Sequence, residues 1–400
     1  MTEPLDTSDI DRYIGVPLHR SGTIEPIVTN DIRRWVQAMH HPNRLHFDDE
    51  YAAESRFGRI VAPQSFTIVT EGSHGARPAL PGNIPDTHML FGGDEWWFFG
   101  PRIFPGDQIV VDQMVFDHRS TETRFAGPTV IQRGDNHYTN TRGEKIALQR
   151  SSSVRFRPAA ARETGAVTDD PKELTESDLA RILKERREYV STISDLGHGR
   201  RSWDEVNIGD ELPAKVIGPH SVVSFATEWR AYLMNVWHAM WYEDLKPIED
   251  SGWTPEMSYS AENAAWDPEF GDGAYFGMSR GHLFPQYAQH LGVPRAYGYG
   301  ASMGAWILDY LSSWAGEWGF VEHSNAQYRG LAFAGDVTYV RGTVTDKTHP
   351  TLRRSFADPA VRGVLPVDPS QGRVHIDYVM TDQNGGLVAK GKGEVLLPRD

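Results

Sequence analysis

The sequence predicts an α+β protein made of two similar halves, each with a central helix and an antiparallel sheet. The chain has 400 residues, which is more than one hydrophobic core usually holds, so two domains are expected. Both halves also show the same order of segments: a helix, an irregular stretch with a histidine, a second helix, then strands. The strands begin at Gly106-Asp107 in one half and at Gly335-Asp336 in the other. We expect about five or six strands per half.

The first half opens with an amphipathic helix. Its apolar residues recur at i, i+3, i+4 and i+7, which predicts one buried face: Ile32, Trp35, Val36 and Met39. The central helix of this half is expected from Gln64 to about Ser73. Farther on, the aromatic run 96–99 is read as core packing in preference to the wall of a wide acyl cavity.

The second half repeats these helices at the corresponding places. The apolar, aromatic run 221–241 corresponds to the first helix, and a central helix is expected near Gly300 to Trp314. The glycines of 298–304 have the spacing seen in some dinucleotide-binding loops. No apolar strand precedes them, however, so the segment is interpreted as the beginning of the central helix.

A polar, charged segment separates the halves. The sequence Thr175-Glu176-Ser177-Asp178 has the pattern of a capping box and predicts a surface helix through Tyr189. The expected organisation is therefore an N-terminal domain at 1–157, a linker helix within 158–200 and a C-terminal domain at 201–400.

Composition excludes several classes of function. The chain contains no cysteine, which removes disulfides, thiolate nucleophiles and cysteine metal sites. A formal net charge of -14 argues against a nucleic-acid partner, since phosphate binding needs a basic surface. No apolar stretch is long enough for a membrane span and the first residues do not resemble a signal peptide, so a cytoplasmic protein without membrane contact is expected.

One segment resembles a known signature. Residues 38–52, AMHHPNRLHFDDEYA, lead to Ile60-Val61-Ala62-Pro63 and resemble the signature of MaoC-like hydratase/dehydratases, particularly those with a fatty-acid-synthase-like N-terminal dehydratase domain. In the second half, residues 282–288 and 292–300 resemble the corresponding C-terminal segment. The resemblance covers most of the chain apart from the linker. It implies a tandem double hot-dog fold, in which each sheet wraps around a long central helix.

The resemblance also implies a reaction. Members of this family add water to, or remove it from, 2-enoyl thioesters, with an Asp/His pair for proton transfer and a backbone N–H at the start of the central helix as oxyanion donor. An acyl-CoA substrate, with a bulky acyl group, is therefore expected, and no cofactor. The two hot-dogs would pair side by side in one sheet, and the chain would form a homodimer or a complex with a related hot-dog subunit.

Carried over residue by residue, the family pattern places the first-half site on the signature segment. The family His corresponds to His46 and the Asn to Asn43, while His41 stands where the family has Asp. The oxyanion donor corresponds to the backbone N–H of Gln64. The cluster of His40, His41 and His46 could also suggest a metal, but its spacing is not that of the two-histidine zinc helix, so no metal is expected.

In the second half the family His corresponds to His282 and the oxyanion glycine to Gly300. The Asp position is Gly277 and the Asn position is Ser279. Neither half therefore keeps the Asp/His pair.

Three explanations stay open. His41 could replace the carboxylate in the first half, because a neutral imidazole can orient or deprotonate water near pH 7. A carboxylate from the segment Asp267-Pro268-Glu269-Phe270-Gly271-Asp272 could complete the second half. Alternatively, both halves are silent, and the protein binds acyl thioesters or stabilises an active dehydratase subunit.

Overall fold

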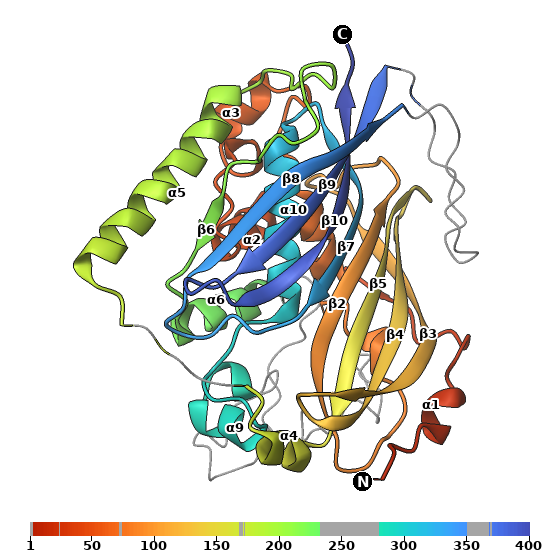
Figure 1. The fold of residues 1–400 in the computed structure, drawn as a ribbon. Helices are drawn as coiled ribbons and strands as arrows, with labels where there is room; N and C mark the ends of the chain where they lie inside the picture. Colours follow the sequence, from red (N-terminus) through yellow and green to blue (C-terminus); the bar gives the residue numbers. More distant parts are fainter. Residues whose placement is uncertain are drawn as a thin grey trace.

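The computed structural model describes residues 3–23, 25–71, 74–167, 171, 173–232, 280–349, 368 and 370–400. Within these residues, ten strands form one sheet in the order β1-β3-β4-β5-β2-β7-β10-β9-β8-β6 (Figure 1). The paired strands are antiparallel throughout: β1 (Ser21–Gly22), β2 (His88–Phe98), β3 (Ile109–Thr123), β4 (Gly127–Asn140), β5 (Lys145–Phe156), β6 (Lys215–Ile217), β7 (Phe320–Tyr328), β8 (Thr338–Thr348), β9 (Gln371–Thr381) and β10 (Leu387–Pro398). Strands of the first half occupy one side of the sheet and strands of the second half the other, as predicted.

Helices of the described residues lie along the chain as follows: α1 (Ser8–Asp11), α2 (Thr29–Ala38), η1 (Arg44–His46), α3 (Asp49–Glu54), η2 (Gln64–Thr70), η3 (Arg77–Ala79), α4 (Pro158–Thr164), α5 (Glu176–Leu196), α6 (Val222–Tyr232), η5 (Arg280–His282), α9 (Pro285–His290) and α10 (Gly300–Ala315). In Figure 1, α10 and α2 lie behind strands β8–β10, and α5 forms the outer left edge. None of the helices in the described part of the chain is long and apolar enough to cross a membrane.

The two halves join where β2 pairs with β7. Their register runs from Gly93 opposite Gln327 to Trp97 opposite His323. At Gly93, whose φ is +153°, a Cβ atom would lie 2.3 Å from the carbonyl oxygen of Ala326, so the close approach of the strands requires glycine. The predicted continuous sheet across the two halves is confirmed.

The central helix of the second half is present where it was predicted. Helix α10 contacts β2, β7 and β10, and nearly all of its side chains are buried. Its contact with β2 means that it packs on strands of both halves, and η2 also packs against it. The core of the molecule therefore centres on α10.

The long helix predicted for the first half is wrong. Residues Gln64–Thr70 form a seven-residue 3₁₀ helix instead, and Ser73 lies outside the described residues. The segment carries a run of β-branched side chains, which lose rotamer freedom in an α-helix: Thr67, Ile68, Val69 and Thr70. The Thr70 hydroxyl also donates to the Thr67 carbonyl at 2.7 Å, a local bond that competes with helix geometry.

An irregular segment takes the place of that helix. The chain after η2, including η3, packs on β3, β4 and β5. Its backbone carbonyls are buried, and polar side chains of the sheet donate to them: Gln132 to Pro81 at 2.8 Å, Ser153 to Ala79 at 2.6 Å, Asn136 to Gly75 at 3.0 Å, and Arg155 to Leu80 and Gly82 at 3.0 and 2.7 Å. This face of the sheet is therefore polar. An apolar helix packed on the same face would need apolar side chains there.

Gln149 connects this face to the second half. Its amide oxygen accepts from Asn136 at 3.1 Å and from Tyr138 at 3.0 Å, and its amide nitrogen donates to Asp94 at 2.6 Å. Asp94 in turn accepts from the hydroxyl of Tyr328 on β7 at 2.8 Å. Asp94 also lies close to α10, because a Cβ atom at Gly304 would be 2.7 Å from its carboxyl oxygen. The irregular segment and α10 therefore pack on the same face of the sheet.

Residues 96–98 of the aromatic run are core, as predicted, and Phe99 is partly buried against Trp97 and Leu148. Trp96 and Phe98 are buried in the main hydrophobic cluster and stack with ring centroids 5.4 Å apart. Trp97 is buried separately against Leu148. None of the three is available to line an open acyl cavity.

Helix α5 agrees with the predicted surface helix in the linker. Thr175 and Asp178 form the capping box, and only Ile182 and Tyr189 are buried along its length. The division of the chain at 157 and 201 stays a prediction.

Gly75 tests the importance of the buried polar network. Gly75 and Gly143 have nearly the same φ, +82° and +81°, but a Cβ at Gly75 would lie 2.2 Å from the Gln149 amide while one at Gly143 would contact nothing within 4 Å. Both Ala variants should lose about 1–2 kcal/mol for the left-handed backbone. Gly75→Ala should lose about 1–3 kcal/mol more, because the Gln149 amide must leave its partners. Urea unfolding followed by circular dichroism measures this difference, and equal losses in the two variants would contradict it.

Candidate active site

His46 lies at the end of a short turn that its neighbours hold in place. The Asn43 side chain accepts from the Leu45 N–H at 3.0 Å and so caps η1. The Nδ1 atom of His46 lies 2.7 Å from the Val61 carbonyl oxygen. A carbonyl oxygen can only accept, so Nδ1 carries the hydrogen and Nε2 is the free base. Burial lowers the pKa of His46 to about 3, which keeps the ring neutral.

His41 faces a carboxylate from the other half of the chain. Its Nε2 lies 3.5 Å from Oδ1 of Asp309 on α10, and neither side chain is exposed. Burial lowers the pKa of His41 well below its usual value, so the contact is not an ion pair at neutral pH. The rings of His41 and His46 meet edge to face with centroids 4.8 Å apart. The sequence-predicted pair is thus brought together, inside the core.

Asp309 belongs to a sealed polar cluster. Burial raises its pKa to about 6, against the opposing effects of Lys215 and Ser65. Burial also lowers the pKa of Lys215 to about 8, and its Nζ donates to the Trp306 carbonyl oxygen at 3.4 Å. These groups polarise one another, but the exposed fraction of Lys215 is only 2%. A substrate could reach this cluster only if the core opened.

Gln64 has a structural partner. Its side chain pairs with the backbone of Val321 on β7, donating to the carbonyl at 2.8 Å and accepting from the N–H at 2.9 Å. Its backbone N–H stands at the start of a 3₁₀ helix of seven residues, where the expected long helix is missing. The macrodipole of a long helix therefore does not assist an oxyanion at Gln64.

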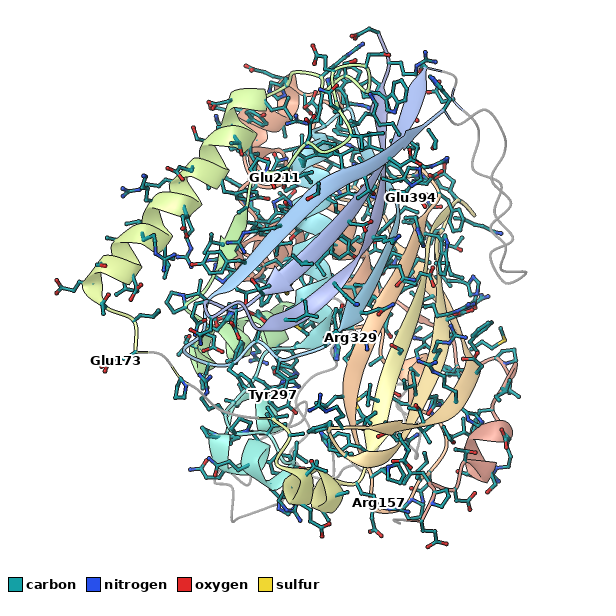
Figure 2. All side chains as sticks on the ribbon, in the orientation of Figure 1. Arg157, Glu173, Glu211, Tyr297, Arg329 and Glu394 are labelled. Atoms are coloured by element: carbon teal, nitrogen blue, oxygen red, sulfur yellow. The ribbon has the colours of Figure 1, made fainter. Side chains whose placement is uncertain are left out.

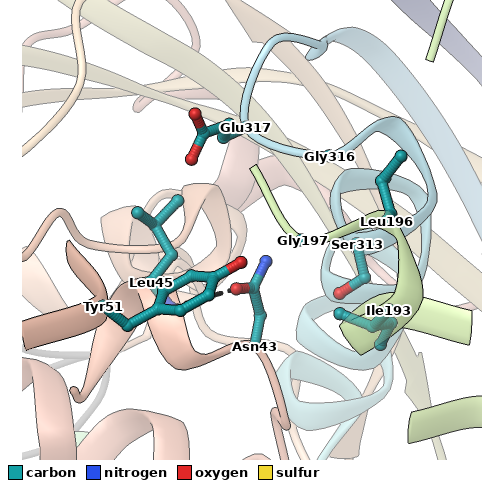
Figure 3. A pocket seen from close by; sticks show the side chains of 9 residues that line it. All are labelled: Asn43, Leu45, Tyr51, Ile193, Leu196, Gly197, Ser313, Gly316 and Glu317. Carbon is teal, nitrogen blue, oxygen red and sulfur yellow. Dashed lines mark hydrogen bonds between the residues drawn. The ribbon is translucent and has the colours of Figure 1, made fainter. Parts of the chain in front are cut away.

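A small cavity lies beside the first-half segment. Figure 3 shows the side chains around it, with Asn43 and Tyr51 on one side and Ser313 of α10 on the other. Its volume of about 10 Å³ suits a single water molecule. A thioester is far larger, so this cavity is not a substrate site as it stands. The lining residues are Asn43, Leu45, Tyr51, Ile193, Leu196, Gly197, Ser313, Gly316 and Glu317.

The second half repeats the histidine geometry. Nδ1 of His282 lies 2.8 Å from the carbonyl oxygen of Tyr297, fifteen residues on, which is the spacing from His46 to Val61. His282 is therefore also an Nδ1–H tautomer with Nε2 as its base, and burial lowers its pKa to about 4. Tyr297 is labelled in Figure 2, in the lower part of the second half.

Unlike Gln64, Gly300 begins a long helix. Helix α10 has no side-chain hydrogen bond at its N-cap, Tyr299. The first N–H groups of a helix have no partner within it, and the helix dipole favours negative charge there. The Tyr299 ring lies with its centroid 4.0 Å from that of His282, so the histidine is next to this helix end.

Gly300 also allows a strand of the first half to approach. A Cβ atom at this position would lie 2.5 Å from Cβ of Phe91 on β2. The same end of α10 is thus bounded by His282 on one side and by Phe91 on another.

Three expected features of the second half lie outside the described residues: Gly277, Ser279 and the acidic segment 267–272. In the described part of the chain, no group of three or more His, Cys, Asp or Glu is arranged to hold a metal ion.

Other polar residues near the end of α10 were missed by sequence reasoning. Ser302 in its first turn donates to Glu228 of α6 at 2.7 Å, and Tyr232 of α6 lies 2.7 Å from the Ser302 hydroxyl. His74 lies beside Tyr232, with ring centroids 4.9 Å apart. Glu228 is the sole acidic residue of the run 221–241, a signal that could have identified it. Asp309 similarly interrupts an apolar helix.

Comparison with known proteins identifies the relationship of the N-terminal half. Residues 12–149 match the family model of the FAS1-like dehydratase domain region. A probable enoyl-CoA hydratase alpha subunit from Thermomonospora curvata is 27% identical over 168 residues, which cover 39% of this chain and 52% of that protein. The match thus spans about half the length of this relative.

One solved structure shares its fold with nearly the whole chain. A MaoC-like dehydratase aligns over 98% of this chain and 100% of its own, with 15% identity and a TM-score of 0.59, which shows that the fold is shared. A Mycobacterium tuberculosis protein with a double hotdog fold aligns over 95% of both chains, with 10% identity and a TM-score of 0.47. The chain thus contains a FAS1-like dehydratase region at residues 12–149 and shares its fold with a MaoC-like dehydratase.

Proposed function

We propose that this protein is a hydratase or dehydratase of acyl-CoA thioesters, adding water to a 2-enoyl group or removing it from a 3-hydroxyacyl group. The proposal rests on one observation above the others: a neutral histidine, His282, lies beside the uncapped N-terminus of a long buried helix. The relatives' names, which include a probable enoyl-CoA hydratase subunit and a MaoC-like dehydratase, agree with this reaction.

The chemistry follows from these two features. The thioester oxygen becomes negative as water attacks C3, and the N–H groups at the start of α10 would stabilise that charge. Nε2 of His282 would accept the proton of the attacking water, since Nδ1 is committed to the Tyr297 carbonyl. With a pKa of about 4, the imidazole is already in its basic form at neutral pH.

The second half is preferred over the first for a physical reason. His46 has the same tautomer, but its partner His41 is packed against Asp309 without exposure, and the helix end at Gln64 is not formed. In this assignment the first half contributes strand β2 to the site, with the Phe91 side chain beside Gly300. We retain the roles of His46, His41, Asn43 and Gln64 as the alternative assignment.

A non-catalytic role is the second candidate. The described residues bring no carboxylate into hydrogen-bond contact with His282, which favours an acyl-thioester-binding or stabilising subunit of a dehydratase complex. The acyl group is not assigned: a bulky or aromatic one is proposed, and the test panel should span short, long and bulky chains.

The two histidines provide a matched experiment. His282→Ala and His46→Ala each remove an imidazole that donates a hydrogen bond to the carbonyl fifteen residues later in the sequence. The two substitutions should therefore lower the free energy of unfolding by similar amounts. Loss of the base should lower kcat about 10²–10⁴-fold in His282→Ala, and His46→Ala should keep most activity. Mass spectrometry of acyl-CoA mixtures, read as gain or loss of water, measures this. The reverse ranking would support the first-half assignment, and a wild type without turnover would support the binding subunit.

Assembly gives a separate prediction. Because members of this family pair hot-dog units further, we expect a homodimer in solution, with twice the 44.9 kDa mass of the chain. Light scattering at micromolar concentration would measure the mass, and a monomer would contradict the homodimer but not the reaction.

A further inference from the structure

Glu228 is a buried carboxyl group with little to compensate its charge. Its residue exposure is 0%, and the described structure gives it one hydrogen bond, from Ser302 to Oε2 at 2.7 Å. Within the described residues, the other oxygen, Oε1, has no partner. Arg230, the nearest cation along the helix, is exposed and lies over the ring of Trp229. Burial therefore raises the pKa of Glu228 to about 8, and the group is protonated at neutral pH.

The position of the proton follows from the hydrogen bond. In the arrangement in which Oε2 accepts from the Ser302 hydroxyl, the acidic hydrogen is on Oε1. Within the described residues, no group accepts a hydrogen bond from Oε1. A carboxylic acid kept neutral by burial is a suitable general acid near pH 7.

Glu228 also stands at the same helix end as His282. Ser302 is in the first turn of α10, two residues after Gly300. The neighbouring Tyr232 packs on Tyr299 with ring centroids 6.0 Å apart, and Tyr299 lies against His282 at 4.0 Å. The carboxyl group and the imidazole are thus both connected to the start of α10, Glu228 through Ser302 and His282 through Tyr299.

We propose that Glu228 is the catalytic acid that complements His282, supplying from α6 the carboxyl group that the second half lacks at position 277. This assignment rests on the proposed hydratase/dehydratase function.

In hydration, the oxygen of water bonds to C3 while its proton passes to Nε2 of His282. The C2=C3 electron pair moves toward the thioester carbonyl, and C2 then takes the proton from Oε1 of Glu228. The sum is addition of one water, with no oxidant or reductant. The imidazolium proton returns to Glu228, directly or through solvent, before the next turnover, and dehydration follows the reverse path.

Other titratable groups near Glu228 must be separated from it in a pH experiment. Tyr232 is on its own helix, and burial raises the pKa of its hydroxyl well above 10. His74 has a pKa lowered to about 3 by burial, so it is neutral throughout. Asp94 on β2 has a pKa raised to about 7, also by burial, and is therefore the group most easily confused with Glu228.

The test compares Glu228→Gln with Asp94→Asn, a matched replacement of a second buried carboxyl group by its amide. In the wild type, the hydration rate of the thioester that reacts fastest in the panel should fall above about pH 8, because Glu228 loses its proton there. Glu228→Gln should lower kcat about 10²–10⁴-fold and abolish this alkaline limb, with little change in melting temperature. Asp94→Asn should keep the limb.

A readout that needs no turnover separates failure of this assignment from failure of the function. Infrared difference spectroscopy should detect a protonated carboxyl group at pH 7 that is absent in Glu228→Gln. Near-wild-type kcat in Glu228→Gln, or loss of the limb in Asp94→Asn alone, would overturn the role of Glu228 while the hydratase function stands. A wild type that turns over no thioester would overturn both.

Discussion

The structure depends on one requirement: the buried backbone that follows η2 must have hydrogen-bond partners. Where an α-helix would satisfy its own N–H and C=O groups, this irregular segment cannot. The strands supply donors instead, among them Gln132, Asn136, Ser153 and Arg155. That demand makes one face of the first-half sheet polar, which excludes the apolar packing that a long central helix would need. The first half therefore has a short 3₁₀ helix where the second half has the long helix α10.

The consequence for chemistry is an asymmetry between two similar histidines. His46 and His282 have the same tautomer and the same spacing to their carbonyl partners, so geometry alone does not separate them. Their electrostatic surroundings do. Only His282 is next to the end of a long α-helix in the described structure, where unpaired N–H groups and the dipole favour a developing anion. The proposed mechanism uses that difference, with Glu228 at the same helix end.

The sequence predicted much of the fold and part of the site. Short-range patterns are enough to recognise α10, the strands after the Gly-Asp turns, and the capping box of α5, because propensity and periodicity act within a few residues. The pairing of the halves into one sheet was also expected correctly. The first-half helix was predicted wrongly, because similarity between the halves was given more weight than the β-branched run 67–70, which disfavours a helix.

The sequence by itself determined which histidines occupy equivalent places, the absence of cysteine chemistry, and the positions of the central segments at Gln64 and Gly300. Only the tertiary structure decided which of the two central segments begins a long helix. It also placed Asp309 against His41, 268 residues apart in the sequence, and Glu228 beside Ser302, 74 residues apart. Contacts at such separations depend on how helices pack on the shared sheet. The pKa values of the carboxyl groups depend on the burial that this packing creates, so neither could be deduced from local sequence.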